Sequence, residues 1–191
     1  MPMTRSSIAA LCMLWIACGP AKVSPRVEVT GSVGGATLKQ TEVLLGEVVS
    51  QRGRIETLVV SISEASGACE LAKSNTATKD TVTLSFTLQN DKGDTLHPGT
   101  YPVIAGRPTG TAGNYTKALI SKLDAACVDA YAGDKGIATG GTVTLSTWSE
   151  GASATGTFDL TVGAETLTGS FAANACAGFT QAMLDTAETC R

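Results

Sequence analysis

The sequence predicts an all-β fold, an antiparallel β-sandwich or barrel of about eight strands with a C-terminal meander of hairpins and one or two short helices. Three observations lead to this class. Apolar and polar residues alternate in several stretches, segments rich in Gly, Asp, Asn or Ser separate them, and only 16% of the 191 residues are charged. Alternation with period two places apolar side chains on one face of a strand, and turn-forming residues between such stretches favour hairpins.

Five stretches show the alternation most clearly. In residues 81–90, Val82, Leu84, Phe86 and Leu88 share one face while Thr and Ser occupy the other. The same pattern occurs in residues 56–63, 141–147, 156–162 and 165–171. Two more strands are expected around residues 101–105 and 115–123, and a first strand near the glycine cluster at 31–35. Because parallel crossovers do not fit between the last three strands, these strands should form antiparallel hairpins.

Helices are expected in two places only. Residues 66–74 favour one or two turns around Cys69, and residues 178–190 place Phe179, Met183 and Ala187 at helical spacing. Three further phenylalanines, Phe86, Phe158 and Phe171, fall on the faces predicted to point inward, so we expect them in the core. We expect residues 27–191 to form a single β-rich globular domain, since this length suits one hydrophobic core.

The chain begins with a short apolar segment. Residues 8–17 are almost wholly apolar and follow one basic side chain, Arg5. A membrane-spanning helix needs roughly 20 apolar residues, whereas the core of a signal peptide needs about 7 to 15. We therefore predict that residues 1–17 are a signal peptide.

The end of this segment resembles the lipobox of bacterial lipoproteins. Ala17 supplies the small residue before Cys18, and Gly19 follows, although Trp15 stands where Leu is usual. The resemblance implies that Cys18 carries fatty acyl chains such as palmitate and becomes the mature N-terminus. Cys12 is a poorer candidate, because the branched Leu11 precedes it. An ordinary secretory signal, cleaved near Ala17 or between Ala21 and Ser24, remains the alternative.

The lipoprotein resemblance also implies a location. Gly19 after the cysteine is typical of lipoproteins sorted to an outer membrane, so the expected place is the bacterial cell envelope, with the membrane side left open. Two or more acyl chains hold a protein on a bilayer for long times. Residues 18–26, which contain two prolines and two cations, are expected to form the lipidated N-terminus and tether.

Four cysteines remain in the mature chain after Cys18 is assigned to acylation. They are Cys69, Cys127, Cys176 and Cys190. An even number in an exported protein predicts two disulfides, and four cysteines allow three pairings. We favour Cys69 with Cys127 and Cys176 with Cys190, because the second bridge would fasten the C-terminal tail to the end of a strand.

Motifs that carry chemistry are missing from the sequence. It contains no G-x-S-x-G nucleophile elbow, no phosphate-binding glycine loop and no cysteine or histidine spacing typical of zinc, and its one histidine is His97. We expect no cofactor and no metal. The net charge of −3 and the lack of Lys/Arg clusters argue against nucleic acid. Trp148, out of phase with Val143 and Leu145, is the one candidate for an exposed contact residue.

The sequence therefore predicts a non-enzymatic lipoprotein anchored in the cell envelope. Its acyl chains would contact the membrane, and its β-domain would serve a structural role or bind another envelope protein. The alternative is a carrier that holds a small hydrophobic ligand in a barrel cavity, since barrels of about eight strands can enclose one. A hydrolase is the third and weakest reading. The C-terminal half also resembles uncharacterised bacterial lipoproteins with a cysteine closing the last hairpin, a resemblance that implies no activity.

Overall fold

The computed structural model describes residues 22–39, 42–49, 53–106, 108, 113–179 and 189–190. The predicted signal peptide, Cys18 and most of the predicted C-terminal helix lie outside these residues. Within them the chain is mostly β, as predicted. The strands of the first half are β1 (Arg26–Gly31), β2 (Glu42–Val49), β3 (Ile55–Ser63), β4 (Thr76–Ala77) and β5 (Val82–Asn90). Those of the second half are β6 (Gly99–Pro102), β7 (Asn114–Lys122), β8 (Gly140–Ser149), β9 (Ser153–Val162), β10 (Glu165–Ala175) and β11 (Thr189–Cys190).

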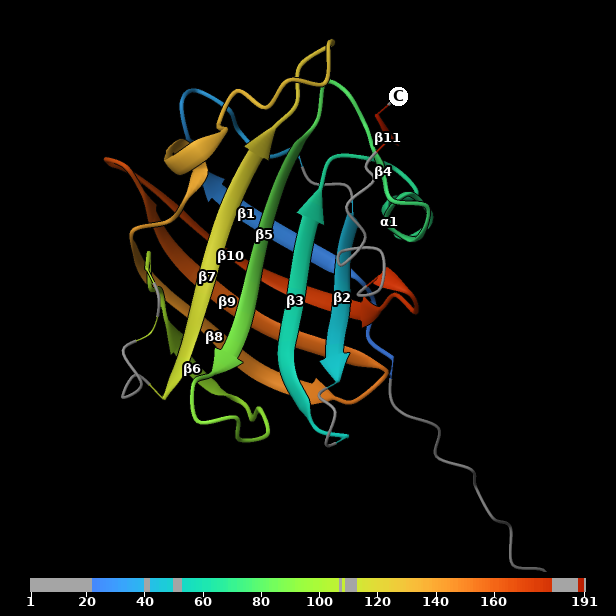
Figure 1. Ribbon diagram of the computed structural model, residues 1–191, viewed down its shortest axis with the longest axis vertical. Helices are drawn as coiled ribbons and strands as arrows, with labels where there is room; N and C mark the ends of the chain where they lie inside the picture. The colour runs from blue at the N-terminus through green and yellow to red at the C-terminus, as the bar shows by residue number, and fades with distance from the viewer. Residues whose placement is uncertain are drawn as a thin grey trace, which may run out of the picture.

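Nine strands form one sheet that almost closes into a barrel. The order is β6-β8-β9-β10-β2-β3-β5-β7, with β1 paired to β10 beside this path. Strands β2, β3, β5 and β7 form one layer, and β1, β8, β9 and β10 cross behind them at a steep angle (Figure 1). An isolated parallel bridge between Val103 and Thr116 joins the strands at the two ends of the order. The predicted fold class is therefore confirmed.

The last three large strands form the predicted meander. Strands β8, β9 and β10 pair antiparallel in sequence, and a two-residue turn joins β9 to β10 at Gly163 and Ala164. Gly163 has a φ of 62°, a value that glycine adopts without steric cost. The only parallel contact of β10 in the described sheet is with β2, over Asn174 and Ala175.

Strand β2 is the element that the alternation does not predict. Its residues Val43, Leu44 and Leu45 are all buried. Val43 and Leu45 face the main core, whereas Leu44 faces a second, smaller cluster on the outside of the sheet. A strand covered on both faces has a continuous apolar run instead of an alternating one.

Three phenylalanine rings fill the middle of the barrel, as their alternation predicts. Phe86 is fully buried, and its ring centroid lies 5.8 Å from that of Phe158 and 5.3 Å from that of Phe171. These spacings lie within the range in which aromatic pairs attract each other. The three rings come from β5, β9 and β10, so they join both layers of the sheet.

The loops between β7 and β8 cover the outer edge of β7. Asp129 holds this region through its carboxylate, which accepts hydrogen bonds from the Tyr131 N–H (2.9 Å), the Lys122 N–H (3.0 Å) and the Ser121 hydroxyl (2.8 Å). The Tyr131 hydroxyl in turn donates to the Val33 carbonyl at 2.5 Å, in the turn after β1. Burial raises the pKa of Asp129, but these three hydrogen bonds outweigh it and leave the pKa below its ordinary value.

We expect Phe86→Ala to destabilise the protein by about 3 to 5 kcal/mol, because it removes a fully buried ring and leaves a cavity between the two layers. Urea denaturation measures this change. Leu119→Ala on the outer face of β7, where the side chain is 44% exposed, is the control and should change the free energy of unfolding by less than about 0.5 kcal/mol. Equal losses in both variants would contradict the assignment of Phe86 to the core.

Asp129 should make stability depend on acid pH. Because its folded pKa is lowered, its contribution is present above the ordinary aspartate pKa of about 3.9 and is lost as the pH falls through the folded value. We expect Asp129→Asn to cost on the order of 1 kcal/mol at neutral pH and progressively less in acid. Urea titrations across this range test the expectation, with Asp134→Asn, an exposed aspartate in the same loop region, as the control. A loss that stays constant down to pH about 2 would argue against it.

Candidate functional site

The four cysteines of the domain form two disulfides, but not in the pairing that we favour from the sequence. Cys69 bonds to Cys176 and Cys127 bonds to Cys190, with Cα separations of 5.8 and 6.2 Å. The prediction of two bridges is confirmed and the preferred pairing is wrong. The physical reason is the path of the tail. Instead of turning back onto the end of β10, the chain near its C-terminus pairs β11 with β4, which places Cys190 beside the loop that holds Cys127.

Trp148 is less exposed than its spacing from Leu145 suggests. The register of β8 against β9 shifts between Leu145 and Thr147, so one extra residue is inserted into β8. Such a β-bulge turns the following side chains to the opposite face. Trp148 therefore packs against the main core, and its indole N–H donates to Glu47 at 2.9 Å. Glu47 also accepts from the Gly151 N–H, so this contact joins the β8–β9 turn to β2.

The described part of the chain has a pocket on the outside of the sheet, under the segment that connects β3 to β5. This crossover segment, residues 64–81, contains the short helix α1 (Ala68–Lys73) and β4. The Glu42 carboxylate on β2 accepts from the N–H groups of Gly67 (2.6 Å) and Ala68 (2.7 Å). It thereby satisfies the free N–H groups at the start of α1 and adds negative charge where the helix favours it.

A small apolar cluster fixes the crossover segment to the sheet. It consists of Leu44, Val59, Ala68, Cys176 and Phe179, with the Cys69–Cys176 disulfide at its edge. Val59 is apolar on a face where its neighbours along β3 are Ser and Thr. This break in the alternation is the feature of the sequence from which a covering segment over the outer face of β3 could have been predicted.

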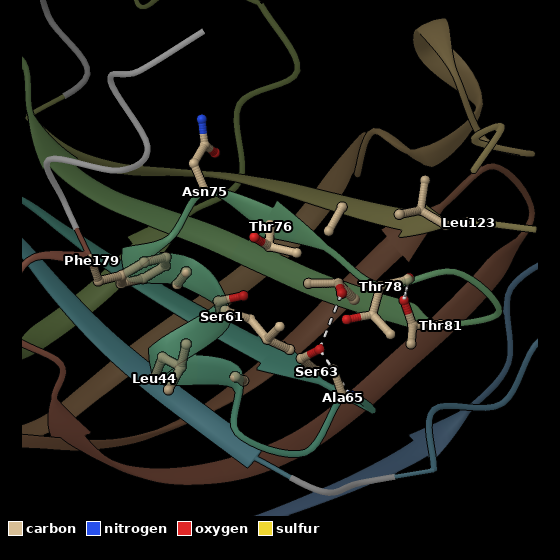
Figure 2. A pocket seen from close by; sticks show the side chains of 15 residues that line it. Leu44, Ser61, Ser63, Ala65, Asn75, Thr76, Thr78, Thr81, Leu123 and Phe179 are labelled. Atoms are coloured by element: carbon tan, nitrogen blue, oxygen red, sulfur yellow. Dashed lines mark hydrogen bonds between the residues drawn. The ribbon is translucent and has the colours of Figure 1, made fainter. Parts of the chain in front are cut away.

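Beside this cluster lies a cavity of about 280 Å³. Hydroxyl groups of Ser61 and Ser63 on β3 and Thr83 on β5 line its floor, and Thr76 to Thr78 line one wall. The hydroxyls of Ser61, Ser63 and Thr78 face the same hollow in Figure 2. Alanine and leucine side chains of α1 and Phe179 add apolar surface, and Leu44, Ala65, Asn75, Thr81 and Leu123 also line the cavity. The cavity is thus part apolar and part hydroxylic.

Hydrogen bonds connect the hydroxyls of the floor to one another and to the backbone. Thr83 donates to the Ser63 oxygen at 3.4 Å, which also accepts from the Ala65 N–H at 3.1 Å, and Ser85 donates to the Ser61 oxygen at 3.2 Å. The Thr78 hydroxyl oxygen is buried and has no hydrogen-bond partner among the described residues. A buried hydroxyl without a partner costs free energy, so Thr78 is held there by the packing of the crossover segment around it.

The described residues that line the cavity carry no charge and no imidazole. A serine or threonine hydroxyl is a weak nucleophile until a nearby base activates it. His97 lies elsewhere, with an exposed ring, while its backbone N–H and carbonyl contact the hydroxyl of the buried Tyr101. No three His, Cys, Asp or Glu side chains in the described ranges lie close enough to hold a metal ion. The geometry suits the binding of a neutral group.

The tyrosines with shifted pKa values also lie away from this cavity. Burial raises the pKa of Tyr101, and a backbone hydrogen bond to His97 partly offsets it. Burial and the nearby Asp91 carboxylate raise the pKa of Tyr115. Tyr101 supports the loop before β6, because its hydroxyl contacts the backbone of His97, whereas Tyr115 on β7 donates to Gln89 on the neighbouring strand β5 at 2.5 Å. Burial and the carboxylates of Glu165 and Asp129 also raise the pKa of Tyr131, whose hydroxyl donates to the Val33 carbonyl.

Among the described helices, none has the length and apolar character needed to cross a membrane. No protein-family model, curated protein or solved structure matches this chain.

The Cys69–Cys176 bridge should hold the crossover segment over the cavity. We expect Cys69→Ala with Cys176→Ala to cost about 2 to 5 kcal/mol and to speed amide hydrogen exchange in residues 64–81, because the bridge fastens α1 to the end of β10. Hydrogen exchange with mass spectrometry measures both effects. Removing the Cys127–Cys190 bridge is the matched control and should leave α1 protected. Unchanged exchange at α1 in the first variant would contradict this role.

Proposed function

We propose that this protein is a lipoprotein of the bacterial cell envelope, anchored through acyl chains on Cys18, whose β-domain has a structural or protein-binding role and performs no catalysis. The observation that carries the proposal is the use of the cysteines. Both disulfides are formed by the four cysteines of the domain, so Cys18 is left outside them. An unpaired cysteine in an exported protein calls for another use, and acylation supplies one that agrees with the lipobox pattern.

The disulfides support the location as well. Bridges of this kind persist in oxidising compartments outside the cytosol, and the Gly19 that follows Cys18 favours the outer membrane.

The binding role rests on the cavity under the crossover segment. Its mixture of hydroxyls and apolar side chains suits a neutral side chain of a partner protein, and its uncharged lining gives no hydroxyl a base. A hydrolase is therefore the weaker proposal. The carrier alternative is weaker for a different reason, because Phe86, Phe158 and Phe171 occupy the middle of the barrel where its ligand would lie.

We expect the protein purified from membranes to have the intact mass of residues 18–191 with a diacylglyceryl group on Cys18 and two disulfides. Cys18→Ala should move the protein from the membrane fraction to the soluble envelope fraction, because it removes the acylated sulfur. Cys12→Ala is the control and should leave attachment unchanged. An unmodified N-terminus downstream of Cys18, or a chain that keeps residues 1–17, would refute the anchor.

A further inference from the structure

The chain is held against the domain only a few residues after Cys18. The Val23 N–H donates to the side-chain oxygen of Asn174 at 3.0 Å, and the Asn174 amide nitrogen donates to the Val23 carbonyl at 2.9 Å. A single side chain thus pairs with both backbone groups of Val23, much as a neighbouring strand would. The pairing of β1 with β10 begins three residues later, with Arg26 opposite Ala172.

This contact limits how far the domain can lie from an acylated Cys18. Five residue steps lead from Cys18 to Val23, and a fully extended chain spans at most about 3.6 Å per residue, or roughly 18 Å. Strand β9 alone, with ten residues, is about 33 Å long. The tether is therefore shorter than the domain, and the surface around Val23 must stay within about 18 Å of an acylated Cys18.

That surface, which we call the anchor corner, consists of residues 22–27, 42–44 and 174–176. It surrounds a second cavity of about 280 Å³ between the starts of β1 and β2 and the end of β10. Lys22 and Arg26 are exposed in it. Its acidic residue, Glu42, already has both carboxylate oxygens bonded to N–H groups of the crossover segment. Glu28, two residues after Arg26 on β1, is exposed and acidic. The excess of positive charge is therefore confined to the anchor corner.

We infer that the anchor corner lies against the membrane surface and that Lys22 and Arg26 favour anionic phospholipid headgroups there. This inference rests on the proposed acylation of Cys18. Each basic side chain close to an anionic membrane shifts binding by about fivefold, and the effect falls off within about 10 Å at moderate salt. Two cations thus shift the ratio of docked to undocked domain by roughly 25-fold, enough to set the orientation of a domain that the tether already holds nearby.

The test uses the chain from Cys18 onward, coupled through its Cys18 thiol to a maleimide-bearing lipid in vesicles, since the other four cysteines are bridged. Trp148→Phe removes the native tryptophan of the mature chain. A new tryptophan is then placed at Ser24 in the anchor corner or, as the matched control, at Leu119, which is 44% exposed on the outer face of β7. Strand β7 lies three strands away from β2 in the sheet order, which corresponds to about 14 Å across the sheet. A phospholipid with a nitroxide headgroup quenches tryptophans near the bilayer surface.

We expect stronger quenching of Ser24→Trp than of Leu119→Trp, and a larger difference in equimolar phosphatidylcholine and phosphatidylglycerol than in phosphatidylcholine alone. Lys22→Gln with Arg26→Gln should remove the effect of phosphatidylglycerol. Asn174→Ala should reduce the difference between the two positions, because it frees the tether as far as Arg26. Equal quenching at both positions, or no effect of Asn174→Ala, would overturn the orientation, and an unchanged phosphatidylglycerol effect would overturn the role of the cations.

The coupled protein separates this inference from the proposed function. Because the lipid is attached chemically, the quenching result reports the geometry of the tether whatever the cell does to Cys18. The intact mass of the native protein reports the acylation by itself. Equal quenching with an acylated native Cys18 would refute only the orientation, whereas an unmodified native chain would refute the anchor and with it the membrane contact of the corner in the cell.

Discussion

The divided pairing of β10 is the constraint on which the other features depend. This strand pairs with β1 over most of its length and with β2 only at Asn174 and Ala175. Its last residues therefore lie where the two layers join. There the Asn174 side chain holds Val23, and Cys176, the next residue after the strand, bonds to the crossover segment. The cavity of the anchor corner lies around this one strand end.

The sequence predicts those parts of the fold in which one face of a strand meets water. Residues 81–90 alternate because Phe86 and its neighbours face the core while Ser85 and Thr87 face outward, and β5 follows that pattern. The same argument finds the strands of the meander. It does not find β2, whose Leu44 is covered on the outside by Phe179 and Ala68, residues far away in the sequence. Alternation of apolar and polar residues reveals a strand only when one face of that strand is exposed to solvent.

The candidate site depends even more on contacts that sequence spacing does not encode. The hydroxyls of Ser61, Ser63 and Thr83 are ordinary outward residues of two strands until the crossover segment covers them. Trp148 changes face because of a single inserted residue in β8, and no local pattern marks that insertion. The disulfide pairing depends on where the tail runs after β10, which local sequence does not determine. The even number of cysteines predicts that disulfides form, but only the fold determines which cysteines pair.

The two disulfides interleave along the chain, since Cys69 and Cys127 come first and each has its partner in the last part of the sequence. During synthesis from the N-terminus, the thiols of Cys69 and Cys127 are both present before Cys176 and Cys190 have been made. Oxidation at that stage joins the wrong pair, and only thiol–disulfide exchange can correct it. The order of the cysteines thus makes correct pairing sensitive to the timing of oxidation relative to the synthesis of the C-terminal part, and early oxidation leaves a bridge that thiol–disulfide exchange has to rearrange.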